Sequence, residues 1–120
     1  MENRLQEFQT YRNRMNERIA QIDHLGIKRF FNLDGAAYKD GALDSRTKEL
    51  LGLTASMVLR CNDCIDYHVI QCVDGGWSDE ELYEGMNVAL IVGGSIVIPH
   101  FRHAVESLDM IRQMKLDSKK

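Results

Sequence analysis

The chain has 120 residues, of which 44% are apolar and 28% charged, as is ordinary for a soluble globular protein. Its formal charge of −3 at pH 7 provides no basic surface for nucleic acid, so no nucleic-acid partner is expected. Residues 1–21 are charged and lack the apolar core of a signal peptide. The longest near-apolar run, Val88 to Ile98, is too short to span a bilayer. The sequence therefore predicts a cytoplasmic protein with no membrane partner.

The N-terminal segment predicts an amphipathic helix over about residues 3–23. Apolar residues recur there at spacings of three and four, with Arg12 at the missing position: Leu5, Phe8, Met15, Ile19 and Ile22. This stripe would pack either on its own domain or on another subunit, and the pattern does not choose between them. A second, short helix is expected over residues 27–41, ending near its glycines.

A third helix is predicted over residues 45–60, with Asp44 or Ser45 as its N-cap. Gly52 inside it costs about 1 kcal/mol relative to alanine, which indicates close approach by a neighbouring helix. Residues 61–74 predict the next helix, with two cysteines at its start and a pair of glycines at its end.

The next helix has a well-defined start. Ser78 and Glu81 form the pattern of a capping box, and Trp77 and Leu82 stand at the positions of a hydrophobic staple. A last helix is expected over about residues 95–115, with an irregularity near the only proline, Pro99. No run of alternating β-branched residues predicts a strand, so the expected fold class is all-α.

The stretch RCNDCIDYHVIQC, residues 60–72, contains all three cysteines and a histidine. At 100° per residue, one helix face carries four potential metal ligands: Cys61, Cys64, His68 and Cys72. However, the first and last of these are about 16 Å apart along the axis, whereas zinc binds ligands at roughly 2.0–2.3 Å. A zinc site built on the first three would need an outside ligand and an unwound first turn.

Cys61 and Cys64, three residues apart at a helix start, are typical of a redox dithiol. Free backbone N–H groups and the helix dipole stabilise a thiolate there, and a second thiol can resolve an oxidised first one. His68 follows Cys64 by one turn on the same face, as expected of a base beside a nucleophile. If residues 45–60 and 61–74 form a hairpin, Glu49 lies one turn from the level of His68 and is placed to orient it.

The remaining candidates have plainer interpretations. Cys72 is predicted to be a buried small hydrophobic residue. His100 and His103 are assigned to a partly exposed helix face or a subunit contact, with anion or metal binding as the alternative. His24 is expected to cap a helix.

The spacing of Glu49, Cys61, Cys64 and His68 resembles the carboxymuconolactone decarboxylase superfamily, specifically its AhpD-like alkylhydroperoxidase branch. The flanking stretches GALDSRTKELLGL, GGWSDEEL and ALIVGG are also similar, and the resemblance covers about residues 33–112. It implies a single-domain AhpD-like helical bundle of about six helices, with the CxxC pair at the N-terminus of a central helix. The expected divisions are a helical extension over 1–32, the domain over 33–115 and a polar tail over 116–120.

The resemblance also implies a homotrimer or homohexamer that reduces (alkyl) hydroperoxides or disulfides through a dithiol–disulfide cycle. Cys64 would attack and Cys61 would resolve, with Glu49 and His68 relaying protons. The order of the cysteines stays open, because the first cysteine of such a pair is often the more exposed. No cofactor or metal is expected, and an external dithiol, of thioredoxin-like or lipoamide type, would be the electron donor.

One residue departs from the AhpD-like pattern. Asp63 stands where these enzymes can carry a histidine, and an acid there opposes thiolate formation. Two alternatives stay open: a non-redox decarboxylase-type enzyme in which His68 does acid–base work, and a zinc-binding or redox-sensing helical oligomer without catalysis.

Overall fold

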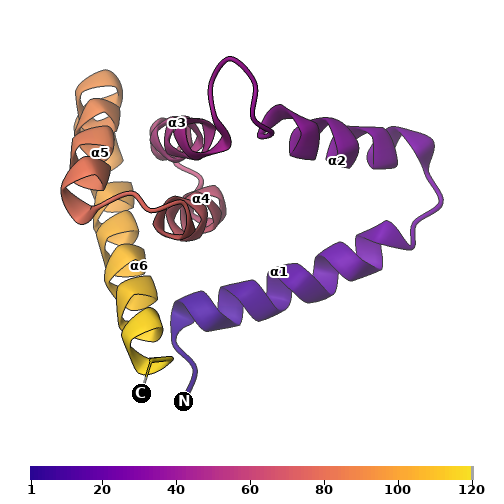
Figure 1. Ribbon diagram of the computed structural model, residues 1–120, viewed down its shortest axis with the longest axis horizontal. Helices are drawn as coiled ribbons and strands as arrows, with labels where there is room; N and C mark the ends of the chain where they lie inside the picture. The colour runs from indigo at the N-terminus through magenta and orange to yellow at the C-terminus, as the bar shows by residue number, and fades with distance from the viewer. Residues whose placement is uncertain (120) are drawn as a thin grey trace. The chain divides into compact units, whose positions relative to one another are not determined.

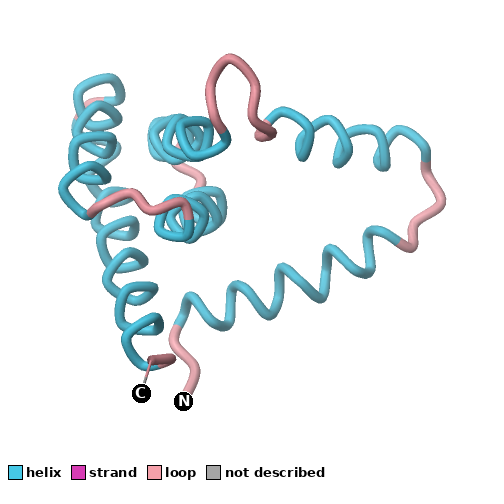
Figure 2. The backbone as a smooth tube through the Cα atoms, in the orientation of Figure 1, coloured by secondary structure: helices cyan, strands magenta, loops and turns pink. Residues whose placement is uncertain are grey.

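The computed structural model describes residues 1–119, which form six α-helices, a short 3₁₀ helix and no strand (Figures 1 and 2). The helices are α1 (Arg4–Ala20), α2 (Leu25–Ala37), α3 (Ser45–Val58), α4 (Asn62–Asp74), α5 (Asp79–Gly93), η1 (Ser95–Val97) and α6 (Ile98–Asp117). The predicted all-α class and helix number are confirmed. No helix in this part of the chain is long and apolar enough to cross a bilayer.

The chain divides into two compact units, Met1–Ser45 and a second unit that begins at Arg46. The expected division into an extension over 1–32 and a domain over 33–115 stays a prediction. The first two residues of the predicted tail, 116–120, continue α6, and residue 120 lies outside the described residues.

The first unit contains α1 and α2, each with a side-chain cap. Asn3 accepts a hydrogen bond from the Gln6 N–H, and the Gln6 side chain accepts one from the Asn3 N–H, both at 2.8 Å. His24 Nδ1 accepts from the Ile27 N–H at 3.2 Å, which confirms its predicted capping role. Yet α2 buries none of its residues. Capping therefore shapes these helices locally, while the apolar surface of α2 stays exposed.

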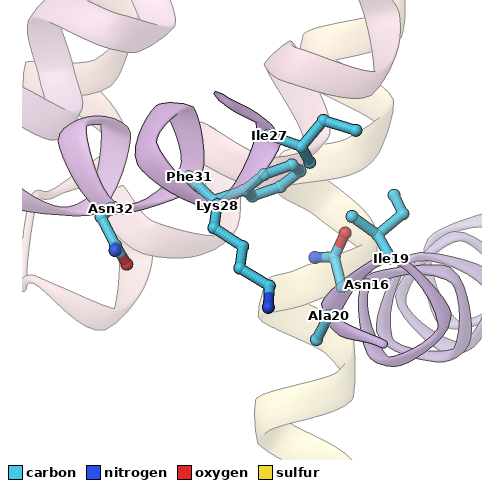
Figure 3. Close-up of a pocket in the computed structure, with 7 residues that line it drawn as sticks. All are labelled: Asn16, Ile19, Ala20, Ile27, Lys28, Phe31 and Asn32. Carbon is cyan, nitrogen blue, oxygen red and sulfur yellow. The ribbon is translucent and has the colours of Figure 1, made fainter. Parts of the chain in front are cut away.

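A hollow of about 350 Å³ lies between the end of α1 and the start of α2 (Figure 3). It is lined by Asn16, Ile19, Ala20, Ile27, Lys28, Phe31 and Asn32. Phe30, Phe31 and Leu33 on α2 are 67%, 46% and 70% exposed. The first unit thus leaves much of its apolar surface uncovered.

The second unit is organised around α4, which lies beside α3 and packs against α6 (Figure 1). This helix contributes seven buried residues: Ile65, Asp66, His68, Val69, Ile70, Cys72 and Val73. Leu53 and Met57 from α3 and Leu108 from α6 are also fully buried. The position of the CxxC pair at the start of a central helix is confirmed.

The connection from α4 to α5 is fixed by two arginines. The Arg46 guanidinium lies 3.5 Å from the centre of the Trp77 ring and donates to Gly75 O at 3.0 Å. Arg112 donates to Trp77 O and to Asp79 Oδ1, both at 2.8 Å. These contacts tie the connection to both α3 and α6.

The predicted signals around α5 and α6 are also present. Ser78 and Glu81 form the expected capping box, with bonds of 3.1 and 2.9 Å, and Leu82 is buried. The predicted irregularity near Pro99 is η1, after which Pro99 occupies the first turn of α6, where its missing N–H costs no hydrogen bond.

Candidate active site

The turn from α3 into α4 fixes the backbone of Cys61 before the helix begins. Arg60 has a φ of 60°, in the left-handed region that non-glycine residues seldom adopt. The Cys61 N–H donates to Ser56 O at 3.1 Å, and Cys61 O accepts from the Ile65 N–H at 2.9 Å. Cys61 is therefore held from α3 on one side and from α4 on the other.

Cys61 and Cys64 are joined by a disulfide, with their Cα atoms 5.3 Å apart. We call residues 61–64 the cysteine turn. Cys61 is the N-cap of α4, and its sulfur accepts a hydrogen bond from the Cys64 N–H at 3.2 Å. A cap of this kind normally uses a side-chain oxygen. Negative charge on the Cys61 sulfur would gain from both this N–H and the helix dipole.

The two cysteines differ in exposure. Cys64 is exposed, whereas Cys61 is only partly exposed. Which of the two cysteines attacks first stays a prediction. Asp63, the acid that departs from the family pattern, is exposed in the first turn of α4.

His68 and Glu49 are in contact, as the hairpin interpretation anticipated. His68 Nδ1 lies 2.8 Å from Glu49 Oε2, and each residue is only 7% exposed. An ionised carboxylate only accepts hydrogen bonds, so Nδ1 carries the proton and Nε2 holds the lone pair of the neutral ring. A histidine fixed in this tautomer is suited to accept a proton at Nε2.

Gly52 makes room for the His68 ring. A Cβ atom at this position would lie 2.6 Å from Cε1, 2.8 Å from Nε2 and 2.9 Å from Nδ1 of the imidazole. The prediction that Gly52 permits close approach is confirmed. What approaches, however, is the side chain of His68.

Cys72 does not join the other ligand-type residues. It is fully buried, and burial, with a smaller contribution from the Glu49 charge, raises its pKa from 9.0 to about 12. It is the buried small residue that the sequence predicts. Residues 1–119 contain no group of three or more His, Cys, Asp or Glu side chains that could hold a metal ion.

A second polar cluster, which sequence reasoning missed, joins α4 to α6. Buried Asp66 accepts a hydrogen bond from Ser107 Oγ at 2.5 Å, and His103 Nε2 lies 2.9 Å from the same oxygen. His100 Nδ1 lies 2.8 Å from Asn62 Oδ1. Both histidines are partly exposed, as predicted, but they bond to α4.

A sequence signal for this cluster existed in the polar residues spaced along two otherwise apolar helix faces. Asn62 and Asp66 are four residues apart on α4, while His100, His103 and Ser107 follow a spacing of three and four on α6. Each set lies along one face of its helix.

Comparisons with known proteins agree with this architecture. The sequence profile described as the carboxymuconolactone decarboxylase family matches residues 27–107. The crystal structure of a protein of this family from Thermotoga maritima, for which a role in the antioxidative response has been suggested, is 52% identical, with a TM-score of 0.89. The match covers 95% of this chain and 97% of that one.

Two more distant relatives follow. The apo structure of a carboxymuconolactone decarboxylase family protein from Legionella pneumophila is 30% identical, with a TM-score of 0.67, over 88% of this chain and 87% of that one. Uncharacterized protein 4 in the cox locus of Paracoccus denitrificans is 33% identical over 82 residues, which are 68% of this chain and 74% of the relative.

Replacing Gly52 with alanine tests the packing of His68. We expect G52A to push the imidazole away from Glu49 and to destabilise the protein by about 1–3 kcal/mol, as for an overpacked core. The slowly exchanging Nδ1 proton of His68 should disappear from the NMR spectrum. The matched control is G35A, because a Cβ at Gly35 meets nothing within 4 Å; it should be neutral or stabilise by up to about 1 kcal/mol. Equal stability of the two variants would contradict this packing.

The buried thiol of Cys72 predicts a pH dependence of stability. Because its folded pKa of about 12 exceeds its ordinary value of 9.0, the unfolded chain releases this proton first as the pH rises above 9. The Cys72 contribution is complete below pH 9 and is lost towards pH 12, by about 1 kcal/mol between pH 8 and 10. Urea unfolding of oxidised wild type and C72A at both pH values checks this. The free energy of unfolding should fall more between the two pH values in wild type than in C72A. An equal fall in both proteins would mean that Cys72 ionises alike in the folded and unfolded states, which would contradict the prediction.

Proposed function

The chain belongs to the carboxymuconolactone decarboxylase family, and from this premise we propose that it is a thiol-dependent redox enzyme that reduces (alkyl) hydroperoxides or disulfides. One observation carries the proposal: the Cys61–Cys64 disulfide stands at the start of α4, on the same helix as a histidine bonded to a buried carboxylate. The resemblance of the Glu49, Cys61, Cys64 and His68 spacing to the AhpD-like branch and the antioxidative role suggested for the Thermotoga maritima protein are consistent with it.

In the oxidative half of the proposed cycle, His68 accepts the proton of Cys64, and the resulting thiolate attacks a peroxide oxygen. The O–O bond breaks, leaving a sulfenic acid on Cys64, and the departing alkoxide takes up the proton to become an alcohol. The Cys61 thiolate then attacks the Cys64 sulfur, forms the disulfide and releases hydroxide, which is protonated to water. The dithiol is oxidised by two electrons, and the peroxide is reduced by two.

The geometry supports this division of roles. Cys64 is exposed to an incoming molecule, while the Cys61 sulfur lies where the Cys64 N–H and the helix dipole favour a thiolate. Glu49 fixes the tautomer of His68 and offsets the positive charge of the ring after proton transfer. We assign Cys64, Cys61, His68 and Glu49 to the catalytic set on this basis.

The reductive half needs an external dithiol, of thioredoxin-like or lipoamide type, and no bound cofactor. The donor thiolate attacks Cys64, and Cys61 leaves as the thiolate that its helix cap stabilises. The second thiol of the donor then attacks the donor sulfur of this mixed disulfide, so that the donor is oxidised to its own disulfide and Cys64 is released as a thiol. Such donors are found in the reducing cytoplasm, where we propose that the protein acts. The Asp63 carboxylate disfavours charge on neighbouring Cys64, so disulfide substrates, which are attacked by the same dithiol, remain within the proposal alongside peroxides.

Thiol counting tests the proposed cycle. After one equivalent of cumene hydroperoxide, alkylation and mass measurement of the denatured protein should show two thiols lost in wild type and in C72A. C64S should lose none, and C61S should stop at a sulfenic acid. H68Q should slow the reaction by about 10²- to 10⁴-fold, because it removes the base. If C61S and C64S consume cumene hydroperoxide as fast as wild type does, the proposed cycle is wrong and the non-redox alternative is favoured.

We further propose that the protein assembles with copies of itself into a trimer or hexamer. The exposed face of α5 and η1 is unusually apolar: Val88, Ile91, Val92 and Ile96 are 53%, 79%, 69% and 57% exposed. The opposite face of α5 buries Leu82, Met86 and Ala89. A helix that is apolar on both faces is expected to be covered on both.

Charge substitution on this face tests the assembly. The double variant Ile91→Lys, Val92→Lys should shift the mass measured by light scattering from an oligomer to a monomer, because two ammonium groups would be buried in the contact. The control is Q113K, which adds a lysine at an exposed polar position of α6, outside the apolar face of α5 and η1. A monomeric wild type at micromolar concentration would refute the proposal.

A further inference from the structure

The polar contacts between α4 and α6 begin inside the cysteine turn. Asn62, which directly follows Cys61, meets His100, and one turn later Asp66 meets His103 and Ser107. The proposed peroxide cycle uses none of these five side chains. They nevertheless connect the reactive end of α4 to a separate helix.

The contact between His100 and Asn62 has a definite direction. The amide oxygen Oδ1 of Asn62 is an acceptor, so His100 Nδ1 is the donor across their 2.8 Å separation. His100 is well anchored, because α6 buries Ala104 and Leu108 completely, and Ser107 and His103 both bind Asp66, which is 3% exposed. The cysteine turn is therefore linked through Asn62 to a helix that is itself fixed.

We propose that His100 is a positioning residue for the Cys61–Cys64 pair, which it holds through Asn62 in the geometry of the closed turn. This inference rests on the proposed dithiol cycle. It concerns the reduced protein, in which the covalent link across the turn is broken and the two thiols must stay close enough to re-form it.

The remaining restraints on the reduced turn show why this contact matters. The backbone bonds of Cys61 to Ser56 and Ile65 fix the first cysteine. The hydrogen bond from the Cys64 N–H fixes the Cys61 sulfur only while that sulfur faces the helix. Among the hydrogen bonds found for the turn, the contact of Asn62 with His100 is the one that ties a side chain from within it to another helix. Losing it lowers the effective concentration of one thiol at the other, as for any loosened intramolecular pair.

The redox equilibrium with glutathione measures this effective concentration directly. In this equilibrium the protein dithiol reacts with glutathione disulfide to give the protein disulfide and two molecules of reduced glutathione. We expect H100A to lower the equilibrium constant for forming the protein disulfide about fivefold, equivalent to about 20 mV towards a more oxidising potential. H100Q, whose side-chain amide can still donate to Asn62, should recover most of the wild-type value. R102A, which removes an exposed neighbouring side chain of α6, is the control and should have no effect.

N62A provides an independent variant that leaves α6 intact. It should reproduce the fivefold effect, and the double variant N62A/H100A should add nothing to it. An unchanged equilibrium in both single variants would overturn the inference. So would a shift in the opposite direction, which is the sign expected if His100 stabilised a thiolate by its charge. If wild type forms no disulfide at all, the proposed function itself fails, which separates that result from a failure confined to His100.

Discussion

The contact between His68 and Glu49 is the interaction on which the geometry of the second unit depends. A carboxylate and an imidazole that are each 7% exposed are costly to bury unless each satisfies the other. Their hydrogen bond sets how α3 and α4 face each other just below the cysteine turn. This contact requires glycine at position 52, because any side chain there would occupy the space of the His68 imidazole ring.

The same helix is anchored on its other side by a second buried carboxylate. Asp66 binds His103 and Ser107 from α6, so α4 carries one acid–histidine contact towards each neighbour. Apolar contacts alone tolerate some rotation of a helix, whereas directional bonds on two sides do not. Turning α4 by one residue would break both contacts. This constraint presents Cys64 to the outside while His68, one turn later, remains inside.

The features predicted from sequence were those that act over short distances along the chain. The caps at His24 and Ser78 depend on residues three positions away. The contact of Glu49 with His68 follows from the tight turn between α3 and α4, because residues at similar distances before and after this turn lie at similar levels along the two helices. The contacts of α6 with α4 were missed, because α5 and η1 intervene and helix spacing does not fix how two such faces rotate towards each other. The left-handed Arg60 was missed too, since that conformation is usually signalled by glycine or asparagine.

The asymmetry of the two sulfurs follows from the position of Cys61 at the N-cap. A residue in that position has an extended backbone, and its side chain turns back towards the first free N–H groups of the helix. Cys64, already inside the helix, has no such cap and extends to solvent. In the later steps of the proposed cycle Cys61 bears the charge, as resolving nucleophile and then as leaving group, while Cys64 attacks the oxidant as a thiolate and is itself attacked by the reductant. Since Asp63 directly precedes Cys64 in the chain, its negative charge opposes mainly the first attack, by the Cys64 thiolate, and the cap of Cys61 continues to favour the steps that follow.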